Sequence, residues 1–274
     1  MPTHHAPINA AAAYTALDAR RFRASELTRG PWHPEHQHAG PPIALVCRAF
    51  EQAAQAHGLG HLARLTANLL RPVPIGELAI ELEGDYVGRN AGHFSARLIS
   101  GEGKEVGRFT ALLQKESDVG LPEGLPGHPL PAMTPMPADA ALATFPFAGR
   151  RVGYADLVET RAARGELFRG PCAIWFRLRH PLLPGEAPSG YQRMAVAADS
   201  GNGISAVLDI GPHSFVNSDL TINLLRAPVG EWVALDARTH LGTNGCGLAE
   251  SALYDVQGLV GRATQSLLVR ARQA

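Results

Sequence analysis

The sequence contains few cysteines, no net charge and no long apolar run. Its three cysteines, Cys47, Cys172 and Cys246, lie far apart and form no CxxC pair, so we expect neither a disulfide scaffold nor a zinc knuckle. The 25 Lys and Arg residues balance 25 Asp and Glu residues, so no net field would attract nucleic acid or an anionic membrane. No apolar stretch approaches the roughly 20 residues that span a bilayer. Residues 1–7 also lack the pattern of a secretion signal, and we predict a cytoplasmic protein that binds neither nucleic acid nor membrane.

Two common kinds of catalytic site are missing as well. The sequence has no G-x-S-x-G nucleophile elbow, and the glycines of residues 101–103 are typical of a hairpin turn rather than of a phosphate loop. His33, His36 and His38 lie close together, but in a proline-containing loop and without a cysteine or carboxylate at a recognised ligand spacing. We therefore predict that the protein uses no metal and no cofactor.

What the sequence does contain is an internal repeat. Residues 65–71, LTANLLR, return as residues 220–226, LTINLLR, with only one position changed. A separation of roughly 155 residues is too long for a solenoid period and indicates two copies of one domain in tandem. Between the copies the chain is rich in proline and poor in periodicity, as linkers are. We predict one domain over residues 1–115, a linker over residues 116–150 and a second domain over residues 151–274.

Each copy is predicted to contain one helix and an antiparallel sheet, because a helical apolar period is followed by alternating segments with glycine-bearing turns. The first copy has a predicted helix over 41–58 and strands over 64–71, 78–87, 93–100 and 106–114. The second has a predicted helix over 189–208 and strands over 217–226, 232–240, 248–254 and 260–270. Extended regions at 14–29 and 157–180 precede the two helices and are expected to add strands.

A long helix wrapped by a curved antiparallel sheet is the hotdog arrangement, and the sequence resembles the type II acyl-CoA thioesterases. The resemblance implies an α+β tandem double hotdog that hydrolyses an acyl-CoA thioester without a metal or a covalent intermediate, and it favours a homo-oligomer. The motifs that carry it are, in chain order, residues 38–40, 70–72, 92–97 and 114 in the first half, and residues 198–199, 219–226, 231–232 and 263–265 in the second.

Asp199 is the candidate catalytic base. It follows the apolar run 194–198, and a lone carboxylate facing a core is costly without a partner or a task. Thioester hydrolysis needs such a group to activate water. The alternative is structural, since residues 199–203 could break the helix and Asp199 could cap the turn.

Three polar residues are candidates for holding the water. The amide of Gln265 can both donate and accept a hydrogen bond, although it could also be an ordinary solvent-facing strand residue. The resemblance implies a threonine or serine two residues before the aspartate that opens the next strand. Asn217 occupies that position here, with Ser218 beside it. Because asparagine would hold water in a different geometry, activity could be weak or altered.

The start of the first helix is the candidate oxyanion site. Backbone N–H groups and the positive end of the dipole favour an anion there. The two prolines that follow Gly40 donate nothing, so Ala39 and Gly40 are the candidate donors, with His38 beside them. The alternative is a conventional proline entry in which glycine only permits close packing.

Arg71 and Arg89 are candidate partners for the phosphates of coenzyme A, although exposed arginines on strands are common.

The function that the candidate residues together predict is an acyl-CoA thioesterase with base-activated water. The alternative is a non-catalytic acyl-CoA or lipid-binding double hotdog, because Asn217 could mark a decayed water site. A hotdog hydratase is a weaker option, since the sequence has no Asp and His pair at the short spacing of such enzymes.

Overall fold

The computed structural model describes residues 10–209 and 211–272, so the outer ends of the two predicted domains and residues 1–7 lie outside it. The first half of the chain contains β1 (Tyr14–Ala16), β2 (Arg21–Ala24), the 3₁₀ helix η1 (Glu26–Thr28), α1 (Gly40–Gln55), β3 (His61–Leu69), β4 (Glu77–Val87), β5 (Ala91–Ser100) and β6 (Glu105–Gln114). The second half contains β7 (Ala141–Ala143), α2 (Tyr154–Leu157), β8 (Val158–Arg164), β9 (Cys172–Leu178), α3 (Gly190–Ala198), α4 (Gly201–Ile204), β10 (His213–Asn217), β11 (Asp219–Leu224), β12 (Trp232–Leu241), β13 (Cys246–Asp255) and β14 (Gly258–Ala271).

The strands form one sheet whose order is symmetric about its centre. From the centre outward the order is β3-β6-β5-β4-β2-β1 on one side and β11-β14-β13-β12-β9-β8-β7 on the other, and β10 also pairs with β14. The central strands β3 and β11 are antiparallel, with Thr66 opposite Thr221. These two threonines hold equivalent places in the repeated segments, and their Oγ1 atoms are 3.3 Å apart. The sequence repeat is therefore the seam at which the two halves of the sheet join.

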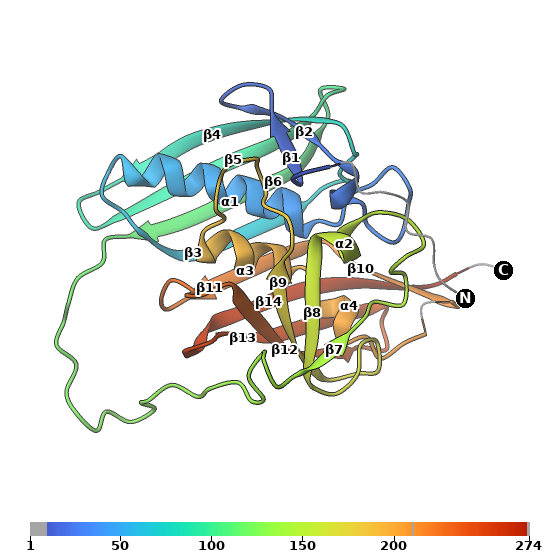
Figure 1. The fold of residues 1–274 in the computed structure, drawn as a ribbon. Helices are drawn as coiled ribbons and strands as arrows, with labels where there is room; N and C mark the ends of the chain where they lie inside the picture. The colour runs from blue at the N-terminus through green and yellow to red at the C-terminus, as the bar shows by residue number, and fades with distance from the viewer. Residues whose placement is uncertain (1–9, 210, 273–274) are drawn as a thin grey trace.

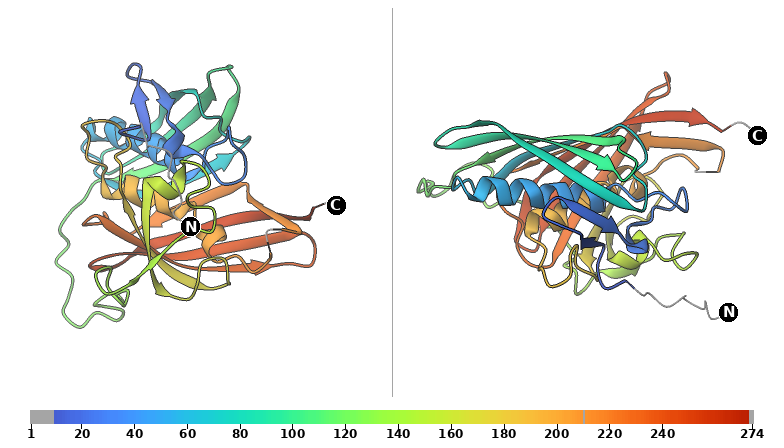
Figure 2. Two further views of the ribbon diagram at one scale, coloured as in Figure 1. Left: turned by 45° about the vertical axis from the view of Figure 1, so that its right-hand side comes forward. Right: turned by 90° about the horizontal axis from the view of Figure 1, so that it is seen from above.

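The two longest helices, α1 and α3, contact each other and lie side by side against one face of the sheet (Figure 1). Seen from above, the strands of the first half curve over one side of α1 (Figure 2). A Cβ atom on Gly40 would lie 2.3 Å from the carbonyl oxygen of Val196, so only glycine allows the start of α1 to approach α3 this closely. Among the described residues, no helix is both long and apolar enough to cross a membrane.

The helix predicted over 189–208 is in fact two helices, α3 and α4. Asp199 ends α3, and Ser200 precedes α4. The Gln265 side chain on β14 accounts for the break, because its Nε2 donates to the Asp199 carbonyl (3.1 Å) and its Oε1 accepts from the Asn202 N–H (2.9 Å). A continuous helix would pair these backbone groups internally. The amide therefore replaces hydrogen bonds of the helix at the position where the chain must turn.

The strand predicted over 217–226 is also divided. β10 ends at Asn217 and β11 begins at Asp219. The register with β14 shifts by one residue between them, since Asn217 lies opposite Leu267 whereas Thr221 lies opposite Thr264. The Asp219 carboxylate accepts a hydrogen bond from the Ser266 N–H at the irregularity (2.6 Å). Local pairing by a side chain thus compensates for the interrupted ladder.

The predicted linker contains more structure than its composition indicates. Its first part is largely exposed, and Figure 1 shows it in green, running away from the strands after β6. Its second part forms β7, which pairs with β8, and buries Met133 and Phe145. The extended regions predicted before each helix are present as β1 and β2 and as β8 and β9.

Candidate active site

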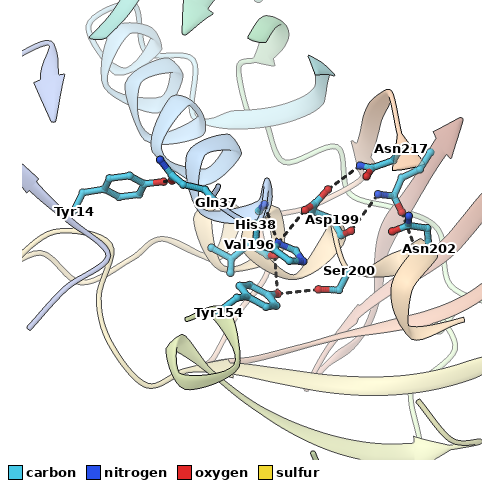
Figure 3. Close-up of polar contacts among 11 residues, drawn as sticks. Tyr14, Gln37, His38, Tyr154, Val196, Asp199, Ser200, Asn202 and Asn217 are labelled. Carbon is cyan, nitrogen blue, oxygen red and sulfur yellow. Dashed lines mark hydrogen bonds and ion pairs between the residues drawn. The ribbon is translucent and has the colours of Figure 1, made fainter. Parts of the chain in front are cut away.

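Asp199 lies at the end of α3, and its carboxylate contacts side chains from two other parts of the chain (Figure 3). Oδ2 is 2.9 Å from Nδ1 of His38, and Oδ1 accepts a hydrogen bond from Nδ2 of Asn217 at 2.9 Å. The side chain is only 5% exposed. The residue therefore ends the helix, but its carboxylate does not cap the turn. It joins the entry of α1, the end of α3 and the end of β10.

This carboxylate is ionised at neutral pH. Burial alone would raise the pKa of Asp199, but the charge and hydrogen bond of His38, the Asn217 amide and the Gly40 N–H together hold this pKa below its ordinary value. The carboxylate therefore keeps its negative charge in the folded protein and can accept hydrogen bonds from further donors.

His38 is fixed in place by Tyr154. The two rings stack with centroids 3.8 Å apart and planes 4° apart. The Tyr154 hydroxyl donates to the Val196 carbonyl (3.0 Å) and lies 2.9 Å from Oγ of Ser200, and burial raises the pKa of this tyrosine. Sequence reasoning placed His38 at the helix entry but missed both its pairing with Asp199 and the role of Tyr154. No spacing links three residues so far apart in the chain.

Gln265 is buried, with 2% of its surface exposed, so the alternative of a solvent-facing residue is wrong. Its Nε2 donates one hydrogen bond to the Asp199 carbonyl, and its Oε1 accepts one from the Asn202 N–H. It also does not line the cavity that opens beside Asp199. Its observed contacts fix the junction between α3 and α4, whereas the predicted contact with water stays a prediction. Asn202 was predicted only as part of a possible helix break at residues 199–203, not as a partner of Gln265.

The two candidate oxyanion donors differ in their surroundings. Gly40 N lies 3.2 Å from Nδ1 of His38, so its N–H is directed at the His38 and Asp199 pair. Ala39 is the N-cap of α1 and lines the cavity, and within the described residues its N–H has no hydrogen-bond partner. Of the two, Ala39 is the donor left free to meet a ligand.

A cavity of about 410 Å³ opens beside these groups. Asp199, His38, Asn217 and Ser218 form part of its polar wall. Most of its remaining lining is apolar and includes Leu69, Val73, Phe145, Phe147, Phe168, Ile204 and Phe215. Phe145 and Phe147 come from the predicted linker, and composition alone had not marked that segment as part of a site. An apolar space with a few convergent polar groups is typical of a binding site for a small, largely apolar ligand.

The structure separates the two candidate arginines. Arg71 lines the cavity and donates from Nη1 to the Glu105 carbonyl (2.6 Å). Arg89 lies in the β4–β5 turn, two residues before Ala91, which pairs with Gln114 at the far end of β6. Arg71 instead follows the end of β3, which pairs near the start of β6. Arg89 is therefore not brought to the cavity.

The histidines of the first loop do not converge on a common point. His33 and His36 stack with ring centroids 4.1 Å apart, whereas His38 turns to Asp199. In the described part of the chain, no group of three His, Cys, Asp or Glu side chains is placed to hold a metal ion.

Comparison with known families identifies the class of protein that this fold and site define. Residues 28–114 match the model of the acyl-CoA thioesterase N-terminal domain, and residues 126–269 match that of the acyl-CoA thioesterase C-terminal domain. The second match alone covers more than half of the chain. The chain therefore belongs to the acyl-CoA thioesterase family and is a thioester hydrolase.

Solved structures share the fold over nearly the whole chain. A candidate thioesterase II from Thermobifida fusca is 17% identical, with 96% of each chain covered and a TM-score of 0.72. A hot dog protein of unknown function from Alicyclobacillus acidocaldarius is 18% identical, with 96% of this chain and 97% of that chain covered and a TM-score of 0.69. An acyl-CoA thioesterase II from Mycobacterium marinum is 14% identical, with 95% and 96% covered and a TM-score of 0.62. At these identities the likeness shows the fold alone, an α+β hotdog. No curated protein sequence gives a significant match.

Proposed function

We propose that the protein hydrolyses acyl-CoA by the attack of a water molecule that Asp199 deprotonates. The observation that carries this proposal is a buried, ionised carboxylate on the wall of an apolar cavity. Its two oxygens each accept one hydrogen bond from a side chain, and a carboxylate has lone pairs for further donors. A water bound there would lie between Asp199 and the Asn217 and Ser218 side of the cavity.

The reaction proceeds in two steps on this geometry. Asp199 takes a proton from the water while its oxygen forms a bond to the thioester carbonyl carbon, and the resulting oxyanion accepts a hydrogen bond from the Ala39 N–H. The carbon–sulfur bond then breaks, the protonated Asp199 returns its proton to the thiolate, and a free acid and coenzyme A leave. The start of α1 adds the positive end of its dipole beside the oxyanion.

We further propose that the fold is a tandem double hotdog, with one copy in residues 1–115 and the other in residues 151–274. The mirrored strand order and the contact between Thr66 and Thr221 support an origin by duplication. The copies supply different parts of the site, since His38 comes from the first and Asp199 from the second. Assembly into a homo-oligomer stays a prediction.

A non-catalytic acyl-CoA-binding protein is the second candidate. The observation that favours it is the Asn217 contact, because the amide occupies Oδ1 of the carboxylate that would otherwise meet the water. The cavity itself would serve binding as well as catalysis.

The decisive experiment measures release of coenzyme A with a thiol reagent from short, medium and long acyl-CoAs. Asp199→Asn keeps the shape of the side chain and removes the base, so we expect kcat to fall by about a hundredfold or more. Asp139→Asn is the matched control, because Asp139 is exposed and outside the cavity. Equal turnover by wild type and Asp199→Asn would refute the mechanism. Saturable binding without turnover in the wild type would establish the binding protein.

A further inference from the structure

A second cavity adjoins the one at Asp199. It has a volume of about 240 Å³ and lies between the loop 29–34 and the segment 147–155. Pro31, Trp32 and Phe147 line both cavities, so the two share a wall. A ligand bound at Asp199 could therefore extend across this wall into the second cavity.

The second cavity is basic. Its charged lining residues are Arg29, Arg150 and Arg151, with His33 beside them, and none of the described residues that line it is acidic. Arg150 and Arg151 are exposed, and in the described part of the chain neither guanidinium has an ion-pair partner. Because the chain as a whole has no net charge, this cluster is a local excess that favours an anion.

Arg29 builds the wall of this cavity rather than remaining free for a ligand. Its Nε donates to the Pro34 carbonyl (2.9 Å) and its Nη1 donates to the Val152 carbonyl, so one side chain ties the loop to the segment. The Tyr154 N–H donates to the Arg29 carbonyl (2.9 Å). A Cβ on Gly153 would lie 2.7 Å from that same oxygen, so glycine is needed for this approach. Through Tyr154 the cavity is connected to the ring of His38.

Trp32 stands at the shared wall with 58% of its surface exposed. A large aromatic side chain that lines a basic cavity and is open to solvent is suited to stack on a planar base, and arginine forks are suited to phosphate oxygens. Adenine and phosphate groups occur together at the far end of coenzyme A, separated from the thioester by a flexible arm.

We propose that this cavity binds the phosphorylated nucleotide end of the acyl-CoA, with Arg150 and Arg151 contacting phosphate oxygens and Trp32 stacking on the adenine. The inference rests on the proposed function, because it assumes that the thioester lies at Asp199. It assigns the phosphate contacts to arginines from the end of the linker and the start of the second half, which the sequence had not singled out.

The test compares two thioesters of one acyl group in the wild type and in Arg150→Gln/Arg151→Gln. One is the acyl-CoA, and the other is the acyl-pantetheine, which lacks the nucleotide. We expect KM for the acyl-CoA to rise roughly tenfold or more, because the variant loses two charge-assisted contacts with phosphate, whereas kcat/KM for the acyl-pantetheine should be unchanged. Arg20→Gln/Arg238→Gln, which changes the net charge equally at exposed positions outside both cavities, should leave both substrates unaffected.

Direct binding separates this inference from the proposed function. Adenosine 3′,5′-bisphosphate carries the nucleotide end alone, and calorimetry should detect its binding to the wild type and to Asp199→Asn but not to Arg150→Gln/Arg151→Gln. If the wild type turns over no acyl-CoA but binds this probe, the proposed function fails and the nucleotide site stands. If the wild type shows equal KM for the two thioesters, or if the arginine variant binds the probe as the wild type does, the inference is overturned while the thioesterase mechanism survives.

Discussion

Nδ1 of His38 lies 2.9 Å from Oδ2 of Asp199, which joins the start of α1 to the end of α3. The two residues come from opposite halves of the chain, so neither half contains the pair alone. The contact also lowers the pKa of Asp199, and it does so at the wall of the cavity. The junction between the halves is thus a packing interface, and it also supplies the His38 contact that favours the ionised form of Asp199.

Removing His38 should shift the pH dependence of the reaction. If Asp199 is the base, activity falls as pH falls through its pKa, and loss of His38 raises that pKa toward its ordinary value or above. We expect the acidic limb of kcat/KM to move to higher pH in His38→Ala. In His38→Asn it should move less, because the amide keeps a donor near the carboxylate. A His38→Asn protein as inactive as Asp199→Asn would instead identify His38 as the base.

Asn217 offers a test of how the water is held. Asn217→Thr replaces the amide that meets Oδ1 with a hydroxyl, which can donate to the carboxylate and bind water, so we expect kcat to stay within about tenfold of the wild type. Asn217→Leu has a similar size but no polar group, and loss of the hydrogen bond should lower kcat by about tenfold or more. Steady-state kinetics with one acyl-CoA checks both. Equal loss in the two variants would show that Asn217 acts through its amide specifically.

Gln265→Glu should affect the site through the backbone. A carboxylate cannot donate to the Asp199 carbonyl, so the junction of α3 and α4 loses a buried hydrogen bond, at a cost of about 1–3 kcal/mol in the free energy of unfolding. The added negative charge near Asp199 should also raise its pKa and move the acidic limb of kcat/KM to higher pH. Gln55→Glu, at an exposed position at the end of α1, is the control. An unchanged pH profile with lower stability would confine Gln265 to a structural role.

The sequence predicted the elements of the fold well because their determinants are local. Apolar periodicity and turn glycines mark α1 and the strands from β3 to β6, and the repeat of residues 65–71 revealed the second half before any contact was known. The break after Asp199 was predicted only as the alternative to one continuous helix, because the Gln265 side chain that accounts for it lies on β14, 66 residues further along the chain. A side chain that competes for helix hydrogen bonds leaves no periodic signal.

The candidate site was predicted only in part for the same reason. Asp199 was recognisable as a lone carboxylate after an apolar run, and Ala39 as the residue before a proline helix entry. Tyr154 and Phe145 had no such signal, since stacking on His38 and lining a cavity depend on where the second half packs. Arg89 illustrates the converse, because its residue type suited a phosphate but its place in the chain puts it at the end of the sheet away from the cavity.

The last prediction concerns stability and the second copy of the repeated segment. Its final residue, Arg226, pairs with the buried carboxylate of Asp255 through contacts of 2.5 and 2.7 Å, and the Val229 and Gln257 N–H groups each donate to the same carboxylate at 2.8 Å. Burial by itself would raise the pKa of Asp255, but these donors lower it overall. Because the folded pKa lies below the unfolded one, the carboxylate adds stability above the unfolded pKa, and that stability is lost as pH falls through the folded pKa.

Asp255→Asn should therefore lower the free energy of unfolding by about 3 kcal/mol at neutral pH, since it leaves a partly buried arginine without its counter-charge. The difference from the wild type should shrink when the measurement is repeated below the ordinary aspartate pKa of about 3.9, because the stability that the charge contributes is lost as pH falls through the lowered pKa of Asp255. Urea unfolding at the two pH values measures both effects. Asp236→Asn is the matched control, because Asp236 pairs with the exposed Arg164 and its loss should cost less than about 1 kcal/mol. A loss that is the same at both pH values would show that the charge of Asp255 does not contribute.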